Sequence, residues 1–321
     1  MQKMLSFVIP CYRSELTVGG VISEIHDKMS ERPELDYEIV AVNDCSPDGV
    51  YNVLRTLSED DKKIKVIDLA KNGGKHAAMM AGYSIAKGDY IVNLDDDGQC
   101  PLDKLWELLQ PLYEGYDIAI ARYPKKKQSA LKNFGSKMNG AMAHYLIDKP
   151  KSLQTSNFSV LKRFVMKEMC SYKNPYPYIS GLMLRTTSKI VNVDMEERER
   201  TAGVGHYTFK KSLALWLNGF TAFSVKPLRI SMVLGALCAL CGFVFGLFTI
   251  IRKIINPDIL MGYSSLMAVL LFVGGIIMMM LGMIGEYIGR IYICINNSPQ
   301  YVIRETININ DADDEAAVNI N

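Results

Sequence analysis

Three adjacent carboxylates, Asp95, Asp96 and Asp97, are the residues in this sequence best placed to do chemistry. They follow an apolar, β-prone run at 90–94, so they stand at the end of an expected strand. Side chains alternate along an extended chain, so Asp95 and Asp97 face one side and can share a hard divalent cation, whereas Asp96 faces the other. Such a cation can accompany a diphosphate. A solvated acidic turn is the alternative interpretation.

Polar residues also follow the first two expected strands, where the letters PCYRSE begin at Pro10 and NDCSPDG begin at Asn43. A carboxylate such as Asp44 at a strand end accepts hydrogen bonds from a ribose diol or a base edge, and Tyr12 offers a ring beside a base. The second segment can equally be a turn that starts a helix. Lys75 follows two glycines at the start of another expected helix, where a lysine and free backbone amides hold phosphate.

The elements that must position these residues alternate between strand-like and helix-like runs. Short runs rich in β-branched or aliphatic residues predict strands at 5–9, 37–42, 64–69, 90–94 and 117–121. Helical spacing predicts helices at 15–29, 50–59, 74–86 and 101–113. This alternation is typical of an α/β fold with a doubly wound, mostly parallel sheet, in which ligands bind beyond the carboxyl ends of the strands.

The charges are distributed very unevenly along the 321 residues. The totals of 36 Lys and Arg and 34 Asp and Glu nearly cancel, which gives no sign of a nucleic-acid partner. Residues 230–251 and 262–285 carry no charge at all. At about 1.5 Å per residue, the first of these runs makes about 33 Å of helix, enough to cross a hydrocarbon core of about 30 Å. We therefore expect two transmembrane helices; a buried helical hairpin in a soluble protein is the alternative.

The flanking charges predict which side of the membrane the rest of the chain occupies. The short first strand is not expected to be a secretory signal. Lys226, Arg229 and Arg290 flank the two expected spans, although Arg252 and Lys253 in the connecting loop oppose this orientation. Seven cysteines without disulfide spacing suit a reducing compartment. We expect a multi-pass protein of the inner (plasma) membrane with its catalytic domain in the cytoplasm.

The ensemble of motifs resembles the family 2 glycosyltransferases of the GT-A fold. Within that family it is similar to the polyprenyl-phosphate glycosyltransferases, a group that includes dolichyl-phosphate mannose synthase and bacterial undecaprenyl-phosphate sugar transferases. The resemblance covers about residues 5–304. It rests on VIPCYRSE from Val8, NDCSPD from Asn43, NGGK from Asn72, DDDGQCP from Asp95, RERTAGVGHY from Arg198, KPLR from Lys226 and GEYIGRIY from Gly285.

The resemblance also implies roles for individual residues. Pro10, Tyr12, Glu15 and Asp44 match the positions that hold the nucleoside. Asp95, Asp97 and Gln99 match the ligands of Mg²⁺ or Mn²⁺, with Asp96 close to the nucleotide sugar. Arg122 and Arg200 match cationic positions that hold phosphates.

The sequence departs from the family pattern at four positions. Asn43 replaces a common Asp and so removes a negative charge beside the nucleoside. Gly205 and His206 replace a common Ser-Lys pair, so a permanent cation becomes a group that titrates near neutrality. Asn157 stands where some relatives carry an Asp proposed as a base, and Gly98 replaces a larger aliphatic residue.

Together these features predict an inverting sugar transferase that uses a nucleotide sugar, preferably a UDP-sugar, and a polyprenyl phosphate acceptor, preferably undecaprenyl phosphate. A transferase that extends a lipid-linked glycan and a non-catalytic membrane scaffold of the same fold are the alternatives. Expected partners are the lipid bilayer, a second copy of the chain and a downstream flippase. The expected divisions are a catalytic domain at 1–225, a juxtamembrane segment with two spans at 226–290, and a C-terminal segment at 291–321 whose acidic end, from Asn308, is disordered.

Overall fold

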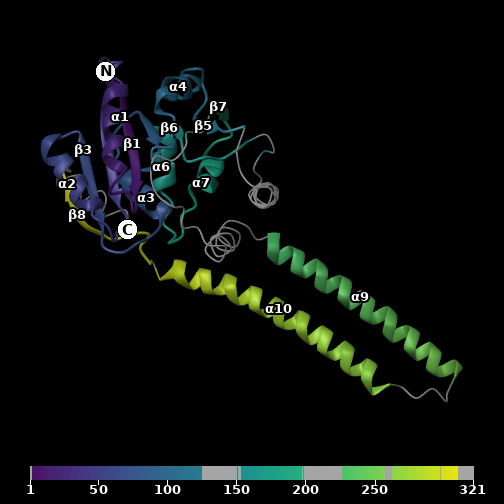
Figure 1. The fold of residues 1–321 in the computed structure, drawn as a ribbon. Helices are drawn as coiled ribbons and strands as arrows, with labels where there is room; N and C mark the ends of the chain where they lie inside the picture. Colours follow the sequence, from purple (N-terminus) through teal and green to yellow (C-terminus); the bar gives the residue numbers. More distant parts are fainter. Residues whose placement is uncertain are drawn as a thin grey trace. The chain divides into compact units, whose positions relative to one another are not determined.

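The computed structural model divides the chain into two compact units (Figure 1). One unit combines Met1–Tyr207 with Asn297–Asn321, and the other is Thr208–Asn296. The structure describes residues 2–124, 150, 153–196, 198, 226–256, 262–296 and 298–309.

An eight-stranded mixed sheet forms the centre of the first unit, in the order β7-β5-β6-β4-β1-β2-β3-β8. Four of its strand pairs are parallel: β1 with β2, β1 with β4, β2 with β3, and β5 with β7. β6 is antiparallel to both of its neighbours, and β8 is antiparallel to β3. The strands are β1 (Met4–Cys11), β2 (Asp36–Asn43), β3 (Ile64–Leu69), β4 (Tyr90–Asn93), β5 (Ile118–Arg122), β6 (Ser159–Lys162), β7 (Ile190–Asp194) and β8 (Ile303–Ile307).

Helices pack on the sheet according to the alternation of side chains along its central strand. Phe7 and Ile9 of β1 belong to the core that includes apolar residues of α1, α2 and α4. Val8 instead meets α3, where a Cβ on Gly82 would lie 2.5 Å from its Cγ1, so only glycine permits this approach. The helices of this unit are α1 (Val18–Ser30), α2 (Val50–Asp60), α3 (Lys75–Ile85), η1 (Leu102–Lys104), α4 (Leu105–Tyr113), α6 (Arg163–Cys170) and α7 (Ile179–Thr186).

The doubly wound, mostly parallel arrangement predicted for the first part of the chain is confirmed, with the expected strands and helices in the expected order. The C-terminal segment differs from the expectation. Residues Ile303–Ile307 form β8 on the edge of β3, so this segment is part of the sheet. Asn308, expected to begin a disordered tail, donates from Nδ2 to the carbonyl oxygens of Ser58 (2.7 Å) and Ile64 (2.8 Å). Residues 310–321 lie outside the described residues.

The second unit contains two long helices, α9 (Lys226–Ile255) and α10 (Tyr263–Ile295), which lie antiparallel and side by side. A Cβ on Gly235 of α9 would meet Cε of Met280 in α10 at 2.6 Å, so the helices are in close contact there. α9 extends beyond its uncharged run at both ends, and α10 continues ten residues past the C-terminal end of its run.

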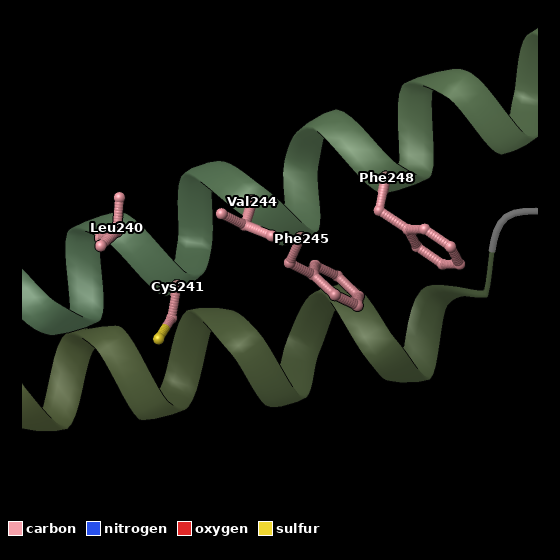
Figure 2. Close-up of a pocket in the computed structure, with 5 residues that line it drawn as sticks. All are labelled: Leu240, Cys241, Val244, Phe245 and Phe248. Atoms are coloured by element: carbon pink, nitrogen blue, oxygen red, sulfur yellow. The ribbon is translucent and has the colours of Figure 1, made fainter.

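Only one described helix is long and apolar enough to cross a membrane by itself. Its stretch Phe272–Ile295 covers 24 residues at a mean hydropathy of 1.6, and none of those whose burial the structure describes is buried. The apolar stretch of α9, Gly235–Phe248, is shorter. Figure 2 shows a hollow along α9 lined entirely by apolar or weakly polar side chains, with Cys241 and Phe245 on the side of α10. Exposed apolar side chains on both helices suit a lipid environment better than water.

Candidate active site

The candidate site lies where the order of the strands reverses. From β1 the chain builds β2 and β3 on one side and then returns to place β4 on the other. β1 stays paired with β2 as far as Cys11, but its pairing with β4 ends at Val8. The loops that leave β1 and β4 therefore flank an opening at the carboxyl ends of the strands, which is the usual ligand site of such sheets.

Hydrogen bonds tie these two loops together. The backbone N–H of Tyr12 donates to Oδ2 of Asp96 (2.9 Å), and the hydroxyl of Thr17 donates to the carbonyl oxygen of Asp96 (2.6 Å). Asp96 is thus held by hydrogen bonds to the loop that follows β1. Tyr12 is 45% exposed, and the guanidinium of Arg13 lies over its ring at 5.6 Å from the ring centroid.

Asp95 has different partners from Asp96. Its Oδ1 pairs with the ammonium of Lys75, and its Oδ2 accepts a hydrogen bond from Nδ2 of Asn157 (2.7 Å). Asp95 to Gln99 form what we call the acidic loop. Within it, Oδ1 of Asp97 accepts a hydrogen bond from the backbone N–H of Gln99 (3.1 Å). Burial, reinforced by the charges of Asp95 and Asp97, raises the pKa of Asp96 to about 6, while the Tyr12 amide acts in the opposite sense.

The residues present fit a cation that arrives with a substrate. No three His, Cys, Asp or Glu side chains in the described part of the chain form a protein-only metal site. Asp95, Asp97 and Gln99 nevertheless supply hard oxygen atoms in one short loop. Mg²⁺ is commonly held by one or two carboxylates together with substrate phosphates and water. Burial is the main cause of the raised pKa of Asp96, and a cation here would relieve the smaller contribution from the negative charges of Asp95 and Asp97.

The turn before Lys75 is built differently from the sequence prediction. Its backbone amides were expected to be free for phosphate, but those of Gly73 and Gly74 donate to the two carboxylate oxygens of Asp44 at 2.7 and 2.9 Å. Gly74 has a φ of +81°, which favours glycine. Asp44 is 3% exposed, and burial raises its pKa while the two amides oppose this shift. Asp44 therefore fixes the turn that delivers Lys75 to Asp95.

The loop after β2 is fastened to the loop after β1. Oε2 of Glu15 accepts from the backbone N–H of Gly49 (3.0 Å), and the N–H of Glu15 donates to Oδ2 of Asp48 (3.0 Å). The N–H of Arg13 donates to the hydroxyl of Ser46 (2.8 Å). Glu15 thus organises the rim of the candidate nucleoside site, and Pro10 lies just beyond the last residue of β1 that pairs with β4.

Asn43 was expected beside the nucleoside, but its side chain is buried in a network below the site. Its Nδ2 donates to Oδ1 of Asp68 (2.7 Å), and its Oδ1 accepts from the N–H of Ser46 (3.2 Å). Arg304 of β8 donates to Oδ2 of Asp68 (3.1 Å). An amide at position 43 can donate to the buried carboxylate of Asp68, whereas an ionised aspartate there would repel it.

Comparisons with known proteins agree with this geometry. The glycosyl transferase family 2 domain matches residues 6–170, which is more than half of the chain, and the GtrB C-terminal hairpin matches residues 226–291. This chain is a family 2 glycosyltransferase. The uncharacterized glycosyltransferase YkcC of Bacillus subtilis is 33% identical over 308 residues, which cover 95% of this chain and 94% of that protein.

Two further comparisons place this glycosyltransferase among its relatives. The prophage bactoprenol glucosyl transferase homolog of Escherichia coli is 30% identical over 302 residues, which cover 94% of this chain and 98% of that protein. The crystal structure of mannosyl-3-phosphoglycerate synthase from Rubrobacter xylanophilus has a TM-score of 0.50 at 22% identity, and the match covers 71% of this chain and 74% of that one. The structural match supports the GT-A fold.

The structure describes one of the two arginines that were expected to hold phosphate. Arg122 forms a two-point ion pair with Asp194 of β7, in which Nη2 lies 2.7 Å from Oδ2. Its guanidinium must leave or share that carboxylate to bind a phosphate. Arg200 and His206 lie outside the described residues.

Sequence reasoning missed two residues beside the site. Arg198 pairs with Glu24 (2.6 Å) and with Asp103, and the backbone at Arg198 exchanges 3.4 Å hydrogen bonds with Gln99. The start of the RERTAGVGHY segment is thereby held against the acidic loop. The other missed residue is His76, discussed below, which follows Lys75 in the first turn of α3. Nothing in its spacing from the other histidines indicates a site.

Proposed function

We propose that this glycosyltransferase transfers a sugar, with inversion, from a nucleotide sugar to a polyprenyl phosphate. The observation that carries the proposal is the acidic loop of Asp95 to Gln99 at the switch point of a family 2 domain that is followed by a GtrB-type hairpin. The bactoprenol relative extends over almost the whole chain, which supports a polyprenyl acceptor. A UDP-sugar donor and undecaprenyl phosphate are the favoured pair.

The donor would lie across the opening between β1 and β4. Tyr12 and Glu15 would meet the nucleoside, with Pro10 and Asp44 shaping the two loops on which it rests. Asp95, Asp97 and Gln99 would hold Mg²⁺ or Mn²⁺, and Lys75 would add a positive charge beside the same loop. The cation would stabilise the negative charge of the leaving nucleoside diphosphate.

The acceptor needs no protein base. A phosphate monoester has a second pKa near 6, so it is mostly a dianion at neutral pH and is already a nucleophile. Asn157 cannot take a proton at the position where some relatives carry Asp; its amide instead orients Asp95. The task of the protein is to bring two phosphate groups together and to offset their repulsion.

Arginines of this chain would offset the repulsion between the two phosphate groups. Arg200 follows Arg198 by two residues. The side chain of Arg198 pairs with Glu24 and Asp103, its N–H donates to the carbonyl oxygen of Gln99, and its carbonyl oxygen accepts from Nε2 of Gln99. This anchoring supports a role for Arg200 beside the reacting phosphates. Arg122 would join it by exchanging its carboxylate partner, Asp194, for the acceptor phosphate.

We further propose that the hairpin crosses the membrane twice and leaves the catalytic domain in the cytoplasm. The connectivity supports this topology: β7 precedes the hairpin and β8 follows it, yet both strands belong to one sheet. A single crossing would place them on opposite sides of the membrane. The number of crossings must therefore be even, so α9 must cross if the longer apolar stretch of α10 does.

The proposal is tested with purified full-length protein in lipid nanodiscs, given Mg²⁺ or Mn²⁺, undecaprenyl phosphate and a panel of radiolabelled nucleotide sugars. We expect label in the lipid extract, in a product that mild acid hydrolyses. Transfer to a free or lipid-linked oligosaccharide with no requirement for the lipid phosphate would instead indicate a glycan-extending enzyme. Absence of transfer from every donor, with donor binding intact, would favour a scaffold.

A further inference from the structure

His76 is a polar residue near the site that the mechanism above does not use. It lies in the first turn of α3, with its ring edge against Tyr178 (centroids 5.5 Å apart, planes at 80°). Its Nδ1 is enclosed by protein and has no hydrogen-bond partner among the residues that the structure describes. A buried polar atom without a partner costs about 1–3 kcal/mol, which suggests that a ligand supplies the missing bond.

A small cavity adjoins this ring. His76 lines it together with Asn157, the hydroxyl-bearing residues Thr155, Ser156, Ser159 and Ser180, and several apolar side chains. Its volume of ≈ 20 Å³ accommodates about one water molecule or one hydroxyl group. None of the described side chains that line it carries a permanent charge, so the cavity suits a neutral polar group rather than a phosphate.

The cavity is connected to the acidic loop at two points. Asn157, in its wall, donates to Oδ2 of Asp95, and Lys75, the residue before His76, pairs with Oδ1 of the same carboxylate. On the proposed function, the donor diphosphate lies beside Asp95. The neutral, hydroxyl-bearing group joined to that diphosphate is the sugar.

The protonation state of the imidazole agrees with a neutral ligand. Burial, with a smaller effect of the Lys75 charge, lowers the pKa of His76 to about 4. At neutral pH the ring therefore carries one N–H donor and one nitrogen acceptor, a set that matches a hydroxyl, which both donates and accepts. A phosphate ligand would instead stabilise the imidazolium form.

We propose that His76 selects the donor sugar, with Nδ1 forming a hydrogen bond to one sugar hydroxyl that enters the cavity beside Asn157. This inference rests on the proposed function for the nature of the donor. Asn157 has two roles in it, because it orients Asp95 and also forms part of the cavity wall.

The test measures donor binding, so it does not depend on turnover. Isothermal titration calorimetry would measure the binding of five ligands to the full-length protein in nanodiscs with Mg²⁺. The ligands are UDP, UDP-glucose, UDP-galactose, UDP-N-acetylglucosamine and GDP-mannose. The variants are His76→Asn, whose amide can take the place of Nδ1, and His76→Leu, which fills the space without a polar atom. His26→Asn is the matched control, because His26 also packs against a tyrosine ring but lies away from the cavity.

We expect His76→Leu to weaken the best-bound nucleotide sugar about tenfold, to leave UDP unchanged, and to reduce discrimination among the sugars. His76→Asn should recover most of the loss, and His26→Asn should match wild type. Monodeoxy analogues of the best donor sharpen the test, since removal of the recognised hydroxyl should weaken wild type but not His76→Leu.

Each outcome separates this inference from the proposed function. Equal binding of every nucleotide sugar by wild type and His76→Leu overturns the selection role and leaves the proposed function standing. Equal loss of UDP and UDP-sugar binding shows that His76 supports the nucleotide site in general, which also overturns the inference. If wild type binds no donor of the panel, both the inference and the proposed function fall. If donors bind and His76 discriminates, yet no sugar reaches the lipid, only the proposed acceptor is wrong.

Discussion

Acid should destabilise the catalytic domain through His76. The lowered pKa of this ring means that the folded state binds its proton less tightly than the unfolded state, in which the pKa is about 6.5. For a base with a lowered folded pKa, the stabilising contribution is complete above about 6.5 and is lost as the pH falls toward the folded value. Charging the ring places a cation in a partly buried site next to Lys75, and none of the described side chains that line the adjoining cavity is an anion.

The size of the effect follows from the two pKa values. With about 6.5 in the unfolded state and about 4 in the folded state, lowering the pH from about 7.5 to about 5 removes about 2 kcal/mol of unfolding free energy. For a domain of this size, that loss lowers the midpoint of thermal unfolding by about 4–8 °C. His76→Asn and His76→Leu have no titrating group at this position, so both should lack this component of the pH dependence.

The assay is thermal unfolding of full-length wild type and both variants in nanodiscs at several pH values, followed by tryptophan fluorescence without nucleotide or metal. All other titrating groups are common to the three proteins, so each variant's difference from wild type reports position 76. The midpoint of thermal unfolding should change with pH by the same amount in the two variants, although their side chains differ in polarity. Parallel curves for wild type and both variants would refute the reasoning, because they would mean that the imidazole accepts its proton in the folded state without cost.

Four other outcomes are expected. Asp97→Ala, or chelation of wild type with EDTA, should remove most sugar transfer without altering the thermal unfolding of the metal-free protein, whereas full activity of a folded variant would contradict the metal assignment. Arg200→Ala should reduce the use of undecaprenyl phosphate far more than the affinity for UDP, as measured by acceptor KM and titration calorimetry. Arg304→Met leaves the 4%-exposed carboxylate of Asp68 with one partner fewer, so it should lower the stability of the domain by about 2 kcal/mol, and adding Asp68→Asn should restore much of that loss in a thermal melt. His206→Lys should hold nucleotide or acceptor affinity nearly constant from about pH 6.5 to about 8.5, whereas the affinity of wild type should weaken as the pH rises; superimposable profiles would place His206 away from the phosphates.

Local patterns in the sequence predicted the elements that are formed by local physics. Strands β1 to β5 follow from short β-branched runs, and the acidic loop at Asp95 falls where a parallel strand must end. The same reasoning placed Tyr12 and Asp96 at one edge of the sheet, and the structure joins them by a hydrogen bond. Parallel strands bring their carboxyl ends together whichever residues make the turns.

Features that depend on residues distant in the sequence could not be predicted from local sequence patterns. Asp44 was assigned to a ligand because nothing near it in the sequence shows that the amides of Gly73 and Gly74 take both of its oxygens. Arg122 reads as a free cation until β7 brings Asp194 beside it. The cavity at His76 draws its wall from segments that are dispersed between residues 76 and 183, so no single motif reveals it.

The last strand of the sheet also fixes the order in which this protein can be completed. A ribosome synthesises β3 early and β8 only after α10 has been made, so the edge of β3 stays open throughout the synthesis of the hairpin. An unpaired edge is a template for association with another chain, which a nascent protein must avoid. Closure of the catalytic sheet therefore follows synthesis of the hairpin of α9 and α10. A fragment cut before α9 would lack Arg304 and leave the buried carboxylate of Asp68 with one partner fewer, so removing the hairpin in this way also removes part of the catalytic domain.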